Sequence, residues 1–130
     1  MVKHDPFIVP IPEETYDMAI ADILRSAVAL RRGEMDPVEA ARCITKLRLE
    51  TSCPDDDVFM AFRVVESDTD RFPLGEARYS CAPEYLERAD AELATYLKEA
   101  TPDLLKACDE LIKWCELKTD EQAGANGSSR

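Results

Sequence analysis

Residues 33–47, GEMDPVEAARCITKL, carry the clearest structural signal in the chain. Gly33 suits the position just after a helix end, because glycine adopts a positive φ without steric cost. Asp36 followed by Pro37 is typical of a helix start, since a carboxylate accepts bonds from free amides and proline needs no amide there. Apolar residues then recur every three or four positions. The stretch therefore predicts two helices joined by a short turn.

Similar patterns on both sides of this stretch predict further helices. Thr101 and Pro102 repeat the sequence of cap and proline, so one helix is expected to end there and another to begin. The run Val58–Val65 also fits a strand, but the three aspartates before it favour a helix, because negative charge stabilises the amino end of a helix. We expect five helices, at about residues 12–32, 37–50, 54–65, 83–100 and 102–117.

The predicted fold is all-α, a single-domain bundle of about five helices. A chain of 130 residues suits one domain, and four glycines are few for a protein with many tight β-turns. Three prolines lie in residues 1–12, which we expect to form an extended arm. The helical domain is expected over residues 13–117. Residues 118–130 are polar and rich in Gly, Ala and Ser, and we expect a disordered tail there.

The net charge of −11 restricts the kinds of partner. Such a surface repels phosphate backbones and anionic lipids, so we expect neither nucleic acid nor a membrane to be the partner. It suits a basic protein, whose encounter rate the charge would raise. The alternative is that acidity only keeps the protein soluble. With no signal-like apolar run at the amino end, a cytoplasmic location is expected.

Motifs for catalysis are missing from the sequence. The only histidine is His4, in the proline-rich arm, where it is poorly placed as a rigid base. No nucleophile elbow, phosphate-binding loop or regular Cys/His zinc spacing occurs. The five cysteines include no CxxC pair and are expected to be free thiols in a reducing compartment. We therefore expect a protein that is not an enzyme and has no cofactor.

One long connection interrupts the helical pattern at residues 66–82. Connections of this length in a small domain are often functional or internally ordered. Pro73 and Gly75 are typical of a tight turn, and we interpret both as structural. We also expect the arginines of this loop to pair with its acids, Arg71 or Arg78 with Glu66 or Asp70.

The alternating acids Glu66, Asp68 and Asp70 raise the question of calcium. A calcium-binding helix–loop–helix needs glycine at the sixth position of its loop and glutamate at the twelfth. Counted from Glu66, those positions are Arg71 and Ala77. The spacing argues against a metal, and a site for acid–base hydrolysis has no defined separation of carboxylates to support it.

The stretch from Asp55 to Asp70 is strongly acidic, with six acids against the single Arg63. A basic partner would be attracted to it. The alternative interpretation is a solvated face whose aspartates cap helices. The candidate partner-binding residues are Asp55, Asp56, Asp57, Glu66, Asp68, Asp70 and Arg78.

Residues 65–78, VESDTDRFPLGEAR, resemble the signature of a bacterial family of small helical proteins of unknown function. That signature has a Ser-Glu-Thr-Asp-like element, then Pro-x-Gly, then Arg. An aspartate stands here in place of its glutamate, and Ser80 and Cys81 stand where the family has tryptophan. The matching positions are Asp68, Asp70, Pro73, Gly75 and Arg78. The resemblance extends over the five expected helices.

The resemblance implies a small acidic helical protein of a kind that serves in immunity, binding a toxin delivered between bacteria and neutralising it in the cytosol. Together with the charge, it makes an immunity protein with a basic toxin partner the leading hypothesis. The alternative is a helical scaffold or adaptor that binds another protein through its loop or arm. A third hypothesis is an enzyme or metal-dependent regulator that uses Glu66, Asp68 and Asp70.

Overall fold

The computed structural model describes residues 11–127, with side chains as far as Glu121. The all-α single domain predicted from the sequence is confirmed. The described part contains no strand, so Val58–Val65 is helical as favoured. The α-helices are α1 Glu13–Arg31, α2 Pro37–Leu47, α3 Met60–Thr69 and α4 Pro83–Gly127. The 3-10 helices are η1 Arg48–Glu50, η2 Asp57–Phe59 and η3 Gly75–Ser80.

The turn between α1 and α2 forms as its sequence predicts. Gly33 has a φ of 73° and donates to the carbonyl of Leu30 at 3.0 Å, while the next amide, of Glu34, reaches back to Ala29 at 2.8 Å. The carboxylate of Asp36 accepts bonds from the amides of Val38 and Glu39, the second and third residues of α2, at 3.0 and 3.1 Å. These bonds satisfy groups that the two helix ends leave free, and they fix the path of the chain between the helices.

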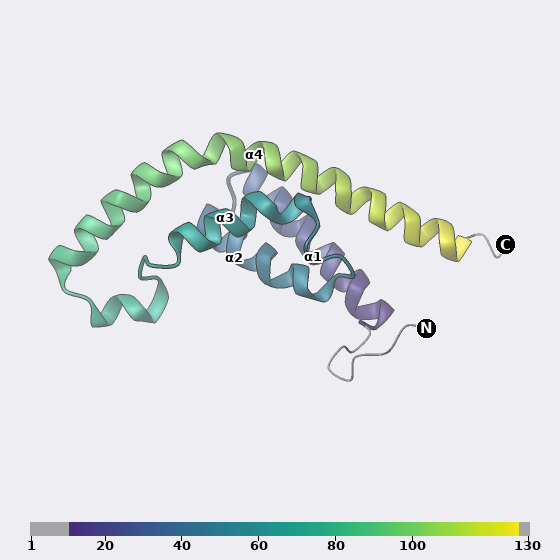
Figure 1. The fold of residues 1–130 in the computed structure, drawn as a ribbon, viewed down its shortest axis with the longest axis horizontal. Coiled ribbons are helices and arrows are strands. Elements are labelled where there is room, and N and C mark those ends of the chain that lie inside the picture. Colours follow the sequence, from purple (N-terminus) through teal and green to yellow (C-terminus); the bar gives the residue numbers. More distant parts are fainter. Residues whose placement is uncertain (1–10, 128–130) are drawn as a thin grey trace.

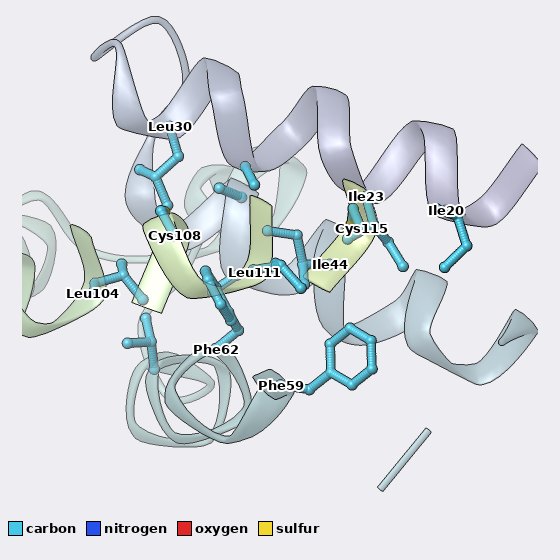
Figure 2. Packing of buried hydrophobic residues seen from close by; sticks show 14 residues of the cluster. Ile20, Ile23, Leu30, Ile44, Phe59, Phe62, Leu104, Cys108, Leu111 and Cys115 are labelled. Carbon is cyan, nitrogen blue, oxygen red and sulfur yellow. The ribbon is translucent and has the colours of Figure 1, made fainter. Parts of the chain in front are cut away.

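One hydrophobic core joins all four α-helices. Ile23 of α1, Ile44 of α2, Phe62 of α3 and Leu111 of α4 are all fully buried. Figure 2 shows these side chains converging from the four helices, with Cys108 among them. Because most of the stability of helices in proteins comes from burying an apolar face, this cluster holds the fold together.

The predicted break at Thr101 is wrong, because α4 continues without interruption from Pro83 to Gly127. Pro102 lies inside the helix, where it lacks an amide and its ring clashes with the preceding turn. The helix bends as a result: Figure 1 shows two arms that meet near the α4 label. A cap followed by proline is typical of a helix start, but here the helix tolerates the proline. The two predicted helices are the two arms of α4.

The end of the helical domain also differs from the prediction. Helix α4 includes residues 118–127, so these are not the disordered tail expected there. Lys118 pairs with Glu121 at 3.5 Å, and the hydroxyl of Thr119 donates to the carbonyl of Cys115 at 2.9 Å. A helix already nucleated on a core adds residues at little cost, which is why polar composition alone was misleading. Residues 1–10 of the predicted arm and 128–130 of the tail lie outside the described residues.

The connection between α3 and α4 is shorter than predicted. Helix α3 includes residues 66–69, so only residues 70–82 link the two helices, and η3 occupies six of these. Gly75 has a φ of 56°, the positive value expected from its place in the turn. No helix among residues 11–127 combines the length and the apolar composition that crossing a bilayer requires.

Candidate functional site

Two of the three aspartates before α3 make contacts within the local structure. Asp56 caps η2 by accepting a bond from the amide of Val58 at 3.0 Å. The carboxylate of Asp55 lies 3.8 Å from both Arg48 and Arg63. Asp57 is exposed at the start of η2. Capping, the alternative interpretation of this acidic stretch, therefore accounts for Asp56, and Asp57 is left free to meet a partner.

Glu66, Asp68 and Asp70 do not come together. Glu66 near the end of α3 and Asp70, the residue that follows this helix, line a hollow shared with α2. Asp68 lies on the side of α3 that meets α4, where its carboxylate accepts a bond from the hydroxyl of Tyr96 at 2.9 Å. Burial, and then this bond to Asp68, raises the pKa of Tyr96 to about 12. Within the described part of the chain, no group of acids, cysteines and histidines is arranged to hold a metal ion.

Arg78 and Arg71 pair with α4, not with the acids predicted. Arg78 makes two bonds of 2.8 Å to the carboxylate of Asp90. Arg71 donates to Glu92 at 3.0 Å and stacks over the ring of Phe72, 4.1 Å from its centre. The prediction of Glu66 or Asp70 as partner was wrong because α3 extends past Glu66 and directs both acids towards α2.

These pairs, together with the bond from Tyr96 to Asp68, form a clasp between residues 68–78 and the first arm of α4. The pair with Arg78 lowers the pKa of Asp90, mainly through the hydrogen bond, and the same bond raises the pKa of Arg78. Along residues 83–100, Ala89 is the only buried residue. The clasp, more than packing, therefore positions this arm.

The outer face of α3 was missed by the sequence reasoning. We use that name for Asp57, Met60, Val64 and Ser67, which follow one another at three- and four-residue spacing and are all exposed. Met60 and Val64 keep 48% and 47% of their surface in solvent. They lie on a different side of the helix from the buried residues Phe59, Phe62 and Val65. The helical spacing of those three buried residues is the sequence signal from which the exposed side could have been identified.

A hollow of about 450 Å³ lies between α2 and α3. Its lining residues are Arg42, Thr45, Lys46, Arg48, Leu49, Glu66 and Asp70. Thr45 and Arg48 each bury a side-chain polar atom, Oγ1 and Nε, for which the described residues supply no hydrogen-bond partner. No sequence pattern had indicated this site, because its cations and acids come from two different helices.

The cysteines are free thiols. Cys108 and Cys115 belong to the core, and burial raises their pKa values to about 11 and about 12. Neutral buried thiols behave as small apolar groups, so both cysteines contribute to the packing of the core.

Comparison with known proteins gives no relative: no family model matches the chain, and neither a curated protein nor a solved structure shows significant similarity to it. The resemblance of residues 65–78 to a bacterial family therefore stays a prediction. Asp68 and Arg78 have identified contacts with α4, and Gly75 has the expected backbone conformation.

Proposed function

We propose that this protein binds another protein, of basic character, through the outer face of α3. The observation that carries the proposal is the pair Met60 and Val64, two large apolar side chains about half exposed on adjacent turns of a helix that otherwise buries its apolar residues. Interfaces commonly combine an apolar centre with a polar rim. Asp57 and Ser67 supply polar groups at the two ends of this pair.

Charge supports a basic partner. The whole chain carries −11, and the six acids of residues 55–70 face a single Arg63. A basic protein would be steered to this region before the apolar side chains make contact, which raises the association rate more than the final affinity. Glu66 and Asp70 line the hollow beside α2 and Asp68 contacts α4, so Asp57 on the outer face and the exposed Asp55 before it are the acids that remain for a partner there.

The specific form of this proposal is an immunity protein that occludes a bacterial toxin in the cytoplasm. The charge, the small size and the resemblance of residues 65–78 support it. A helical scaffold or adaptor would use the same surface. The two functions differ in one respect: only the immunity protein neutralises an activity of its partner.

The test uses the product of the neighbouring gene as the candidate partner. We expect the double variant M60S/V64S to weaken binding at least about tenfold, since truncating central interface residues typically costs more than 1 kcal/mol. M18S/L117S is the control, because Met18 and Leu117 are even more exposed, at 67% and 61%, but lie on α1 and α4. If both double variants lose affinity equally, or if neither loses affinity, the outer face is not the binding surface.

Two further measurements separate the immunity protein from the scaffold. Co-expression with the neighbouring product should restore growth if that product is toxic, and M60S/V64S should lose this protection while M18S/L117S retains it. D55N/D57N should slow association and reduce its salt dependence, with a smaller effect on dissociation. Binding without protection would favour the scaffold, and no binding would remove both forms of the proposal for that partner.

A further inference from the structure

The hollow between α2 and α3 has two walls of opposite charge. Arg42 and Lys46 lie one turn apart on α2, and Glu66 lies on α3 four residues before Asp70, which caps the end of that helix. No ion pair of 4.0 Å or less crosses between these four described side chains. Opposite charges therefore face each other with room between them.

Few of the polar groups on these walls are used by the protein itself. Arg42 makes one long bond, of 3.4 Å, to the carbonyl of Thr69. Arg48 donates from one terminal nitrogen to the carbonyl of Pro54, at 2.9 Å, and that nitrogen lies 3.8 Å from Asp55, while its Nε has no partner among the described residues. Thr45 is 8% exposed and its hydroxyl is also unpartnered.

Within the described part of the chain, only Thr45 and Arg48 bury a side-chain polar atom that has no hydrogen-bond partner. Both residues line this hollow. A buried polar group without a partner costs about 1–3 kcal/mol, so each calls for an explanation, such as a bound ligand or ordered water.

We propose that this hollow binds a small zwitterion, with its carboxylate on the Arg42–Lys46 wall and its ammonium group on the Glu66–Asp70 wall. A simple anion would be repelled by the two carboxylates, and a simple cation by the three cationic side chains, Arg42, Lys46 and Arg48. A ligand carrying both charges gains from both walls. The volume of about 450 Å³ lies within the usual range of small-ligand sites.

This site is distinct from the surface proposed for the protein partner. Met60 and Val64 point outward from α3, whereas Glu66 and Asp70 line the hollow on its α2 side. A small molecule would occupy the space between two helices of the body, and the partner would cover the exposed face of one. The two proposals can therefore fail separately.

The test titrates the full chain with three probes: 4-aminobutyrate, butyrate and butylammonium. The first carries both charges, and each of the others carries one of them on a similar carbon chain. We expect 4-aminobutyrate to shift the amide NMR signals of residues 42–49 and 66–70, and to bind at least about tenfold more tightly than either half-ligand.

Charge variants test the assignment of the two walls. E66Q/D70N should lose the preference for 4-aminobutyrate and should bind butyrate more tightly than the unchanged protein, because the repulsion is removed. K46Q should weaken both carboxylate-bearing probes and strengthen binding of butylammonium. The matched controls, K98Q and E76Q, remove exposed charges outside the hollow and should leave all three probes unaffected.

Two results would overturn the proposal. One is the absence of any localised shift with 4-aminobutyrate up to about 10 mM, a concentration that detects even weak ligands. The other is equal binding of the three probes, which would mean that the two charged walls do not select a ligand that carries both charges. Thermal unfolding of each variant confirms that the fold is intact, and binding of the protein partner by E66Q/D70N reports on the other surface independently.

Discussion

Arg78 and Asp90 are joined by two parallel hydrogen bonds of 2.8 Å, from Nη1 to Oδ1 and from Nη2 to Oδ2. The pair connects η3 to the first arm of α4, and it has the bidentate geometry that only arginine can offer a carboxylate. Both side chains are partly exposed, so the pair orients the arm more than it stabilises the whole molecule.

R78K should therefore loosen the first arm of α4 while leaving global stability almost unchanged. A lysine keeps the charge but makes no bidentate contact. Hydrogen–deuterium exchange should accelerate at residues 83–97 and remain unchanged at 104–115. R25K is the control, because Arg25 pairs with Asp22 within α1. Unchanged exchange along the arm in R78K would contradict the role given to the clasp.

The clasp should also respond to acid. The pKa of Asp90 is lowered in the folded protein, below the ordinary value of 3.8. The stabilising contribution of this carboxylate is thus complete above pH 3.8, the ordinary pKa, and is lost as the pH falls through the lowered pKa. We expect the NMR signals of η3 and the arm to shift in that window, and the shift should be absent in D90N.

P102A should straighten α4. Alanine restores an amide to the helix interior and removes the ring that bends it, and it is a far better helix former. The second arm is fixed in the core by Leu104 and Leu111, so the first arm is the part that must move. It should move away from residues 68–78, its partners in the clasp. Small-angle scattering should show a larger maximum dimension. P83A, at the first residue of α4, should not change it, and identical scattering from P102A would be contrary to this prediction.

L111A should destabilise the protein by about 2–5 kcal/mol, the usual cost of truncating a buried leucine. Leu111 is fully buried where the helices meet. Leu117, 61% exposed on the same helix, provides the control, because L117A should change the free energy of unfolding by less than about 0.5 kcal/mol. Urea denaturation measures both. Similar values for the two variants would place Leu111 outside the core.

The buried thiols predict a loss of stability in alkali. The pKa values of Cys108 and Cys115 are raised from 9.0 to about 11 and about 12 by burial. The contribution of these buried thiols to stability is complete below pH 9, where the thiols of the unfolded chain are also protonated. It is lost as the pH rises through the pKa values of the folded protein. Urea midpoints at increasing pH should fall in this window, and C108A/C115A should flatten the dependence. A midpoint independent of pH would count against the burial of these thiols.

Local chemistry made part of this fold predictable. Gly33 and Asp36 act within a few residues of themselves, so their roles follow from sequence alone and were confirmed. Pro102 was ambiguous, because a proline after a threonine is compatible with a helix start and with a bend. The structure shows a bend, and the local pattern around Pro102 does not distinguish the two outcomes.

The candidate sites were harder to predict because they join distant segments. Arg78 finds Asp90 twelve residues away, on another helix, and no rule of spacing selects Asp90 over the nearer acids. Met60 and Val64 become recognisable as exposed only once the neighbouring stripe is known to be buried. The hollow required the relative placement of α2 and α3, which is a property of packing.

The contribution of α4 to the core has a consequence for synthesis on the ribosome. Helices α1 to α3 are complete by Thr69, but the core also requires Leu104, Cys108, Leu111 and Cys115. At roughly 5–20 residues per second, the ribosome needs several seconds to add the roughly 45 residues between Thr69 and Cys115. During that interval Ile23, Ile44 and Phe62 have no covering helix. The nascent chain is then a natural client for a chaperone that holds apolar segments, and slow codons within α4 would prolong its exposure.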